Sequence, residues 1–152
     1  MIALSRIDSR LIHGQVIEAW LPHLRVARVV VADDEAARDP MAKFAYDMAV
    51  PPNVEVVLGP VDQLDFSSLA QDRVATLVLF RDVKSAVVAR EHGLPDGTLN
   101  VGNVHSGPGR AAISRSVFLD ESDKQALESL ERSGMHVSVQ AVPSDPELRL
   151  PH

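Results

Sequence analysis

The two stretches that decide the fold are Val26-Ala-Arg-Val-Val-Val-Ala32 and Val74-Ala-Thr-Leu-Val-Leu-Phe80, in which nearly every residue is apolar. Strands with one face in water alternate apolar and polar residues, whereas continuous apolar runs are typical of strands buried on both faces. The other predicted strands are Ile2 to Ile7, Val54 to Leu58, Thr98 to Val101, Ile113 to Leu119 and His136 to Val142. The sequence therefore predicts a mostly parallel sheet of about seven strands.

Segments with helical spacing separate these strands, which indicates a single α/β domain with helices on both faces of the sheet. The residues that share a helical face are Val16, Ile17, Trp20 and Leu21, then Ala37, Met41, Phe44, Ala45 and Met48, then Val83, Ala86 and Val87, and finally Ala126, Leu127 and Leu130. Pro22 should end or kink the first helix because it lacks an N–H group. Asp120 is the expected N-cap of the last helix, and Gly134 should end it.

The composition is that of a globular domain, with 152 residues, 45% apolar and 24% charged. The net charge of −6 argues against nucleic-acid binding, and the absence of cysteine excludes disulfides and thiolate chemistry. The apolar runs are too short to span a bilayer and no signal peptide is evident, so we expect a cytoplasmic protein. Residues 1–143 are expected to form the domain and residues 144–152 a C-terminal surface extension, with poor order as an open alternative.

The loop after the first strand reads Arg6-Ile-Asp-Ser-Arg-Leu-Ile-His-Gly-Gln15. Ligands of parallel sheets bind beyond the carboxyl ends of the strands, so this loop is the first candidate site. A neutral imidazole such as that of His13 is a competent nucleophile, and Asp8 could fix its tautomer. Arg6 and Arg10 could bind phosphoryl oxygens.

A helix N-terminus near Gly14 and Gln15 offers free N–H groups to an anion. These residue types together suit a histidine that accepts and passes on a phosphoryl group. A purely structural interpretation is also open, in which both arginines are surface charges, Asp8 caps the helix and His13 is hydrogen-bonded in its first turn.

The string from Arg6 to Val16, followed by Trp20, resembles the N-terminal signature of the EIIB component of mannose/fructose/sorbose-type sugar phosphotransferase systems. The family pattern runs close to R-I-D-D-R-L-I-H-G-Q-V. The segment Asn100-Val-Gly-Asn-Val-His105 is similar to the family's N-[IV]-G-G-M-H, and the last helix and the final strand also agree. The resemblance covers almost the whole chain.

The resemblance implies a largely parallel α/β fold and a phosphohistidine at His13. It implies that the EIIA component donates the phosphoryl group, which then passes to a sugar held by the membrane components EIIC and EIID. Arg6 and Arg10 become phosphoryl-binding cations, Asp8 orients the loop or the imidazole, and the amides of Gly14 and Gln15 complete the anion site. No metal or organic cofactor is implied, and the protein would associate peripherally with the permease.

Two positions depart from the family pattern. Ser9 stands where the family usually has a second aspartate, which makes the loop less negative. Asn103 and Val104 replace the usual glycine and methionine in a loop that could contact a partner or the sugar. The departures leave His13, Arg6 and Arg10 in place.

Two further residues are candidates for the same site. His105 follows a predicted strand and is either a loop-structuring residue or a second functional histidine. Arg81 follows the fourth strand and could meet an incoming phosphate, or could be a surface arginine paired with Asp82 or Glu121. No histidines have metal-ligand spacing, and Pro108 stands where a P-loop would need its lysine, so neither a metal site nor a nucleotide site is expected.

Three functions remain distinguishable by experiment. The first is a phosphocarrier that serves sugar uptake. The second is a regulatory phosphocarrier that signals by binding a partner without phosphorylating sugar. The presence or absence of EIIC and EIID genes nearby would distinguish the first function from the second. The third is a domain that binds an anion without transferring it, and it predicts full activity after substitution of His13.

Overall fold

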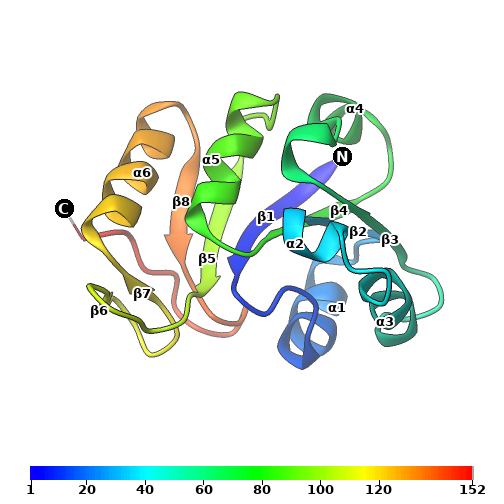
Figure 1. The fold of residues 1–152 in the computed structure, drawn as a ribbon, viewed down its shortest axis with the longest axis horizontal. Helices are drawn as coiled ribbons and strands as arrows, with labels where there is room; N and C mark the ends of the chain where they lie inside the picture. Colours follow the sequence, from blue (N-terminus) through cyan, green and yellow to red (C-terminus); the bar gives the residue numbers. More distant parts are fainter. Residues whose placement is uncertain (152) are drawn as a thin grey trace.

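The computed structural model describes residues 1–151, and its centre is a six-stranded sheet with the order β3-β2-β4-β1-β5-β8 (Figure 1). Every neighbouring pair in this sheet is parallel. The strands are β1 (Ile2–Asp8), β2 (Arg28–Ala32), β3 (Glu55–Gly59), β4 (Thr76–Phe80), β5 (Thr98–Asn103) and β8 (His136–Val139). The predicted α/β class with a mostly parallel sheet is confirmed.

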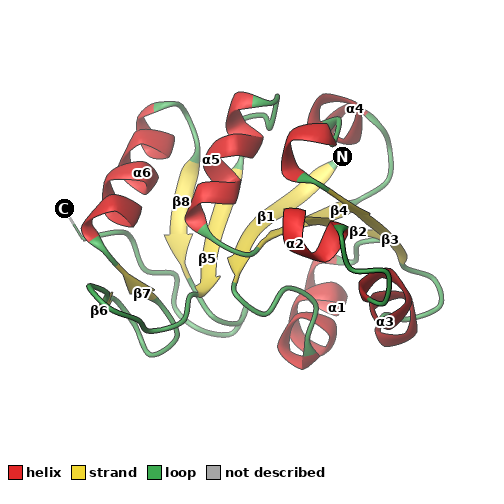
Figure 2. Cartoon of the chain, in the orientation of Figure 1, coloured by secondary structure: helices red, strands yellow, loops and turns green. Residues whose placement is uncertain are grey.

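Helices cover both faces of the sheet (Figure 2). They are η1 (Val16–Trp20), α1 (Leu21–Leu24), α2 (Asp34–Ala37), α3 (Ala42–Ala49), η2 (Val61–Gln63), α4 (Phe66–Gln71), α5 (Val83–Glu91) and α6 (Glu121–Arg132). Val30 and Val78 belong to the core beneath α4, α5 and α6. Their neighbours Val29 and Leu77 belong to the core beneath η1 and α1. Successive strand residues thus enter opposite cores, which is why both positions must be apolar.

The last helix forms as expected. The Asp120 side chain accepts from the Asp123 N–H while the Asp123 side chain accepts from the Asp120 N–H, a reciprocal capping box. Gly134, just past the helix end, has a φ of 111°, a conformation that favours glycine.

The prediction of a seventh sheet strand at Ile113–Leu119 is wrong. β6 (Ala111–Ala112) and β7 (Phe118–Leu119) instead form a separate antiparallel pair. Val117 in this hairpin is nevertheless fully buried. Apolar residues of this segment therefore contribute to the core, but from a hairpin beside the sheet.

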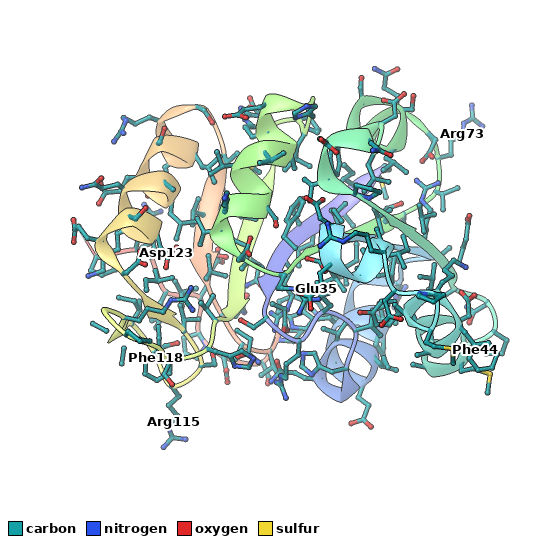
Figure 3. The ribbon with its side chains drawn as sticks, in the orientation of Figure 1. Glu35, Phe44, Arg73, Arg115, Phe118 and Asp123 are labelled. Atoms are coloured by element: carbon teal, nitrogen blue, oxygen red, sulfur yellow. The ribbon has the colours of Figure 1, made fainter. Side chains whose placement is uncertain are left out.

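The helical face that contains Met41, Phe44 and Met48 is exposed. The chain divides into α2 and α3 here, and these three side chains are 63%, 61% and 73% exposed; Figure 3 shows Phe44 on the outer side of α3. Ala42 and Tyr46 pack partly against the core in their place. The apolar stripe of α3 faces outward.

Pro22 does not end the first helix. η1 is a π-turn in which the Leu21 N–H donates to the Val16 carbonyl, and Pro22 then lies in the first turn of α1. The π-turn directly before Pro22 changes the hydrogen-bond register of the helix, so the helical segment continues through a residue that lacks an N–H. The helix ends only at Arg25, whose φ is 54°.

The segment predicted to be a C-terminal extension packs against the domain. Leu148 exchanges main-chain hydrogen bonds with Val139 at 2.7 and 3.0 Å. Leu150 is 4% exposed and belongs to the core. His152 lies outside the described residues. Within residues 1–151, no helix combines the length and the apolar character needed to cross a membrane.

A matched pair of substitutions tests this core. Phe66 has no exposed surface and packs against Phe80 with ring centroids 6.2 Å apart, whereas Phe44 is 61% exposed. Phe66→Ala should lower the free energy of unfolding by about 3–5 kcal/mol because it leaves a cavity. Phe44→Ala should change it by less than about 0.5 kcal/mol. Urea unfolding of both variants measures the difference, and equal losses would contradict the packing described.

Candidate functional site

The loop after β1 leaves the carboxyl edge of the sheet from its interior, between β4 and β5 (Figure 1). A tight turn begins at Asp8, whose carbonyl accepts from the Leu11 N–H at 3.0 Å and whose Oδ1 accepts from the Arg10 N–H at 3.0 Å. Leu11 has a φ of 56° although its side chain is buried. Core packing therefore holds a backbone conformation that is costly for leucine and fixes the main chain around Arg10.

Arg6 has no exposed surface, and its guanidinium is held from several directions. Nε and Nη2 donate to Asp8 Oδ2 at 3.2 and 3.0 Å. Nη1 donates to Asn100 Oδ1 at 2.6 Å and to the Gln140 carbonyl at 3.2 Å. Nη2 also donates to Gln15 Oε1 at 3.0 Å. The expectation that Arg6 contacts a phosphoryl group directly does not fit this burial, because each of its nitrogens already has a protein acceptor.

Two residues close the space around this guanidinium. Its Cζ lies 5.1 Å from the centroid of the Trp20 ring, within the range of a cation–π contact. A Cβ on Gly102 would lie only 2.0 Å from the same Cζ. Burial lowers the pKa of Arg6, and the Asp8 carboxylate opposes that shift; arginine remains charged at neutral pH.

His13 is oriented by the same carboxylate. Its Nε2 lies 2.8 Å from Asp8 Oδ2. Burial raises the pKa of Asp8, but the hydrogen bond from His13 and the charge of Arg6 outweigh burial, and the pKa is lowered overall. Asp8 is therefore ionised at neutral pH and can only accept, so Nε2 carries the proton of the neutral ring.

The other imidazole nitrogen of His13, Nδ1, differs from Nε2 in its surroundings. The lone pair lies on Nδ1, and within residues 1–151 only Nε2 of this ring forms a hydrogen bond. The side chain is 14% exposed, so it is reachable at the surface. The arrangement can present a nucleophilic nitrogen while holding the opposite side of the ring on a carboxylate.

Arg10 differs from Arg6 in both exposure and partner. It lies at the surface, and its guanidinium meets the carboxamide of Asn103. With the amide oriented so that both of its polar atoms are satisfied, Asn103 Oδ1 accepts from Nε and Nη2 of Arg10 at 3.0 and 2.7 Å. Arg10 is the arginine of this loop that can reach a ligand.

Gly14 and Gln15 lie at the start of the helical segment that leads into η1. A Cβ added to Gly14 would meet no atom within 4 Å, so open space adjoins the main chain directly after His13. The Gln15 side chain is committed to Arg6. The structure thus brings Arg6, Asp8, His13 and Gln15 together, with Arg10 and Gly14 on the same loop.

Within residues 1–151, neither Arg81 nor His105 forms a hydrogen bond with Arg6, Asp8, His13 or Gln15. Arg81 pairs with Asp33 at 2.8 Å and approaches Glu35 at 3.8 Å, so its partner is neither Asp82 nor Glu121. The main chain of His105 bridges two loops, because its N–H donates to Ser9 Oγ at 3.2 Å and its carbonyl accepts from Arg110 at 2.9 Å. Both contacts are made by the main chain, so the two interpretations of the His105 side chain stay predictions.

Three residues of the site were not predicted as such: Asn100, Asn103 and Gln140. Asn100 is 1% exposed within β5, and a buried carboxamide inside an apolar strand is a signal that could have been used. Gln140 contributes mainly a carbonyl, which side-chain chemistry cannot reveal. No group of three or more metal-ligating side chains occurs in residues 1–151.

Comparison with known proteins agrees with the fold. Residues 2–151 match the model of the family described as PTS system sorbose subfamily IIB component. The chain therefore belongs to the sorbose subfamily of IIB components of the phosphotransferase system (PTS), whose members act in sugar phosphotransfer.

Among its relatives is N-acetylgalactosamine-specific phosphotransferase enzyme IIB component 2 of Escherichia coli K12, 33% identical over 150 residues, which span 98% of this chain and 96% of that protein. The fructose-specific EIIB component of Bacillus subtilis 168 is 33% identical over 95% of this chain and 90% of its own length. The crystal structure of N-acetylgalactosamine-specific IIB component 1 from E. coli superposes with a TM-score of 0.91 at 26% identity, covering 99% of this chain and 100% of that one.

The close approach of Gly102 to Arg6 gives a second prediction. Gly102→Ala should displace the buried guanidinium from Asp8 and lower the free energy of unfolding by about 3–5 kcal/mol, the cost typical of breaking a buried ion pair. Gly14→Ala is the matched control, because its added methyl group meets nothing within 4 Å. Thermal or urea unfolding compares the two, and a Gly102→Ala protein as stable as Gly14→Ala would contradict the arrangement around Arg6.

Proposed function

We propose that this chain is a phosphohistidine carrier, which accepts a phosphoryl group on His13 from an EIIA component and transfers it to a sugar taken up through EIIC and EIID. The observation that most directly supports this is the His13–Asp8 contact, which leaves the lone pair on Nδ1 of a side chain that is 14% exposed. Membership of the sorbose subfamily and the names of its relatives support the same reaction.

The accepting step is a transfer between two imidazoles. The Nδ1 lone pair of His13 attacks the phosphorus of the donor phosphohistidine, the donor's P–N bond breaks, and its electron pair returns to the donor ring. The His13 ring gains positive charge, which the Asp8 carboxylate stabilises through the Nε2 proton.

The donating step reverses the roles. A sugar hydroxyl oxygen attacks the same phosphorus, the bond to Nδ1 breaks, and its electron pair returns to His13. The hydroxyl proton passes to water or to a base outside this chain. Neither step requires a metal or an organic cofactor, because positioning and charge stabilisation supply the catalysis.

The two arginines have separate roles in this proposal. Arg10 neutralises the charge on the phosphoryl oxygens, together with the main-chain amides at Gly14 and Gln15. Arg6 acts through Asp8, keeping that carboxylate ionised and in place beneath the imidazole. The proposed partners would place the chain in the cytoplasm, bound peripherally to the permease.

A relay assay tests the acceptor. The protein is incubated with phosphoenolpyruvate, the general phosphotransferase proteins and a mannose-type EIIA, and its intact mass is measured. Wild type should gain one acid-labile phosphoryl group, and His13→Gln should gain none, because it lacks the nucleophilic nitrogen. His105→Gln is the matched control and should be phosphorylated like wild type. Phosphate on His13→Gln would show that the acceptor is another residue.

Another prediction concerns Asp8. Asp8→Asn should slow phosphoryl uptake at least about 100-fold, because a carboxamide no longer fixes the Nε2–H tautomer or stabilises the charged ring. It should also lower the free energy of unfolding by about 3–5 kcal/mol, since Arg6 loses its counter-charge. Stopped uptake reactions and urea unfolding give the two values; unchanged uptake by a folded Asp8→Asn protein would contradict the role of Asp8.

The pH dependence of stability checks the same carboxyl. Its pKa is lowered in the folded protein, so its stabilising contribution is present above the unfolded value of about 3.9 and is lost as pH falls through the folded value. Asp8→Asn should therefore lose less stability than wild type on acidification.

A further inference from the structure

Asn103 is held rigidly at the end of β5. It is the sheet partner of Asp8 in the parallel pairing of β1 with β5. Its main-chain carbonyl accepts from the Ser9 N–H at 2.8 Å and from Ser9 Oγ at 3.3 Å. Its side-chain nitrogen donates to the Ser116 carbonyl at 3.3 Å, which leaves the amide oxygen facing Arg10. The acceptor that meets Arg10 is therefore fixed by the sheet and by the β6–β7 hairpin.

This acceptor is neutral, in contrast to the carboxylate that binds Arg6. Arg10 gives two donors, Nε and Nη2, to the Asn103 oxygen, and the contact orders a long side chain that is otherwise exposed. A charged acceptor adds the Coulomb attraction of an opposite charge, which a neutral carboxamide does not offer to the guanidinium. A phosphoryl dianion can therefore replace the carboxamide as the acceptor of Arg10, whereas it could not easily replace the Asp8 carboxylate as the acceptor of Arg6.

The contact joins the two places at which the sequence departs from the family pattern. Ser9 replaces an aspartate and Asn103 replaces a glycine, and their main chains are hydrogen-bonded to each other. A glycine at 103 would offer Arg10 no side chain, and an aspartate at 9 would add a negative charge next to Arg10.

We propose that Asn103 is a positioning residue for Arg10: its carboxamide orders the guanidinium before transfer and releases it to the incoming phosphoryl group. The proposal rests on the phosphocarrier function proposed above. It depends on the neutrality of residue 103, because a carboxylate there would hold Arg10 in an ion pair and would repel the phosphoryl group.

The test uses two variants, Asn103→Asp, which keeps the shape and adds a charge, and Asn103→Ala, which removes the acceptor. Single-turnover uptake from phosphorylated EIIA is measured over a range of donor concentrations. Asn103→Asp should lower the maximal rate at least about 10-fold, with the half-saturating concentration changed less than about threefold. Asn103→Ala should lower the maximal rate about 3- to 10-fold, because Arg10 must then be ordered during the reaction.

Ser116→Ala is the matched control. It removes the 2.8 Å hydrogen bond from Ser116 Oγ to the Gly102 carbonyl in the same loop and leaves the acceptor for Asn103 in place. It should take up phosphate at the wild-type rate, and thermal unfolding should show all three variants folded. Wild-type uptake by Asn103→Asp, or equal slowing by Ser116→Ala, would overturn the proposal.

A readout without transfer separates this proposal from the carrier function. The Nε–H signal of Arg10 is assigned in a ¹⁵N spectrum by its loss in Arg10→Lys, and inorganic phosphate is added as the probe. The signal should shift in wild type, should not shift in Asn103→Asp, and should broaden in Asn103→Ala without phosphate. If wild type shows this shift but gains no phosphate from charged EIIA, the carrier function fails alone; no shift in wild type overturns the role of Asn103.

Discussion

The guanidinium of Arg6 lies in the interior with no exposed surface, and the rest of the site depends on how its charge is compensated. A buried charge without partners would cost several kcal/mol, so acceptors must come from every side. Asp8 supplies the counter-charge, while Asn100, Gln15 and the Gln140 carbonyl satisfy the remaining donors. Because these groups come from different parts of the chain, the site forms only when the central sheet and the first helical segment are in place.

The same ion pair sets the chemistry of His13. One oxygen of Asp8, Oδ2, accepts from Arg6 and from the imidazole, so the interior cation keeps the carboxylate charged and the carboxylate fixes the tautomer. The two arginines of the loop then do different work. Arg6 is locked to a charged acceptor and cannot leave, while Arg10 rests at the surface on the neutral oxygen of Asn103. The guanidinium that stays in place, that of Arg6, is bound by a carboxylate. The guanidinium that must move to the phosphoryl group, that of Arg10, is bound by a neutral carboxamide, which attracts it less strongly.

Most of the sheet could be predicted from the sequence, because strands buried on both faces appear in it as continuous runs of apolar residues. Such a run does not identify the partner strand, so Ile113–Leu119 resembles a sheet strand although its buried residues, Val117 and Leu119, belong to a hairpin. The exposure of one face of α3 could not be predicted either. Helical periodicity shows that Phe44 and Met48 share a face, but not whether that face is covered.

The loop chemistry was predictable from residue types, whereas the depth of Arg6 was not, since arginine is exposed by default. The sheet register nevertheless contains a usable signal. Arg6 pairs with Asn100, and Asn100 pairs with Ser138, so three neighbouring strands carry a polar residue at the same depth. Each of these polar residues lies within a strand of the buried sheet, and all three are at most 2% exposed. Because a polar group in such a position must find a partner, aligned polar residues on adjacent parallel strands indicate a buried polar layer beneath the carboxyl edge, where a site can be built upon it.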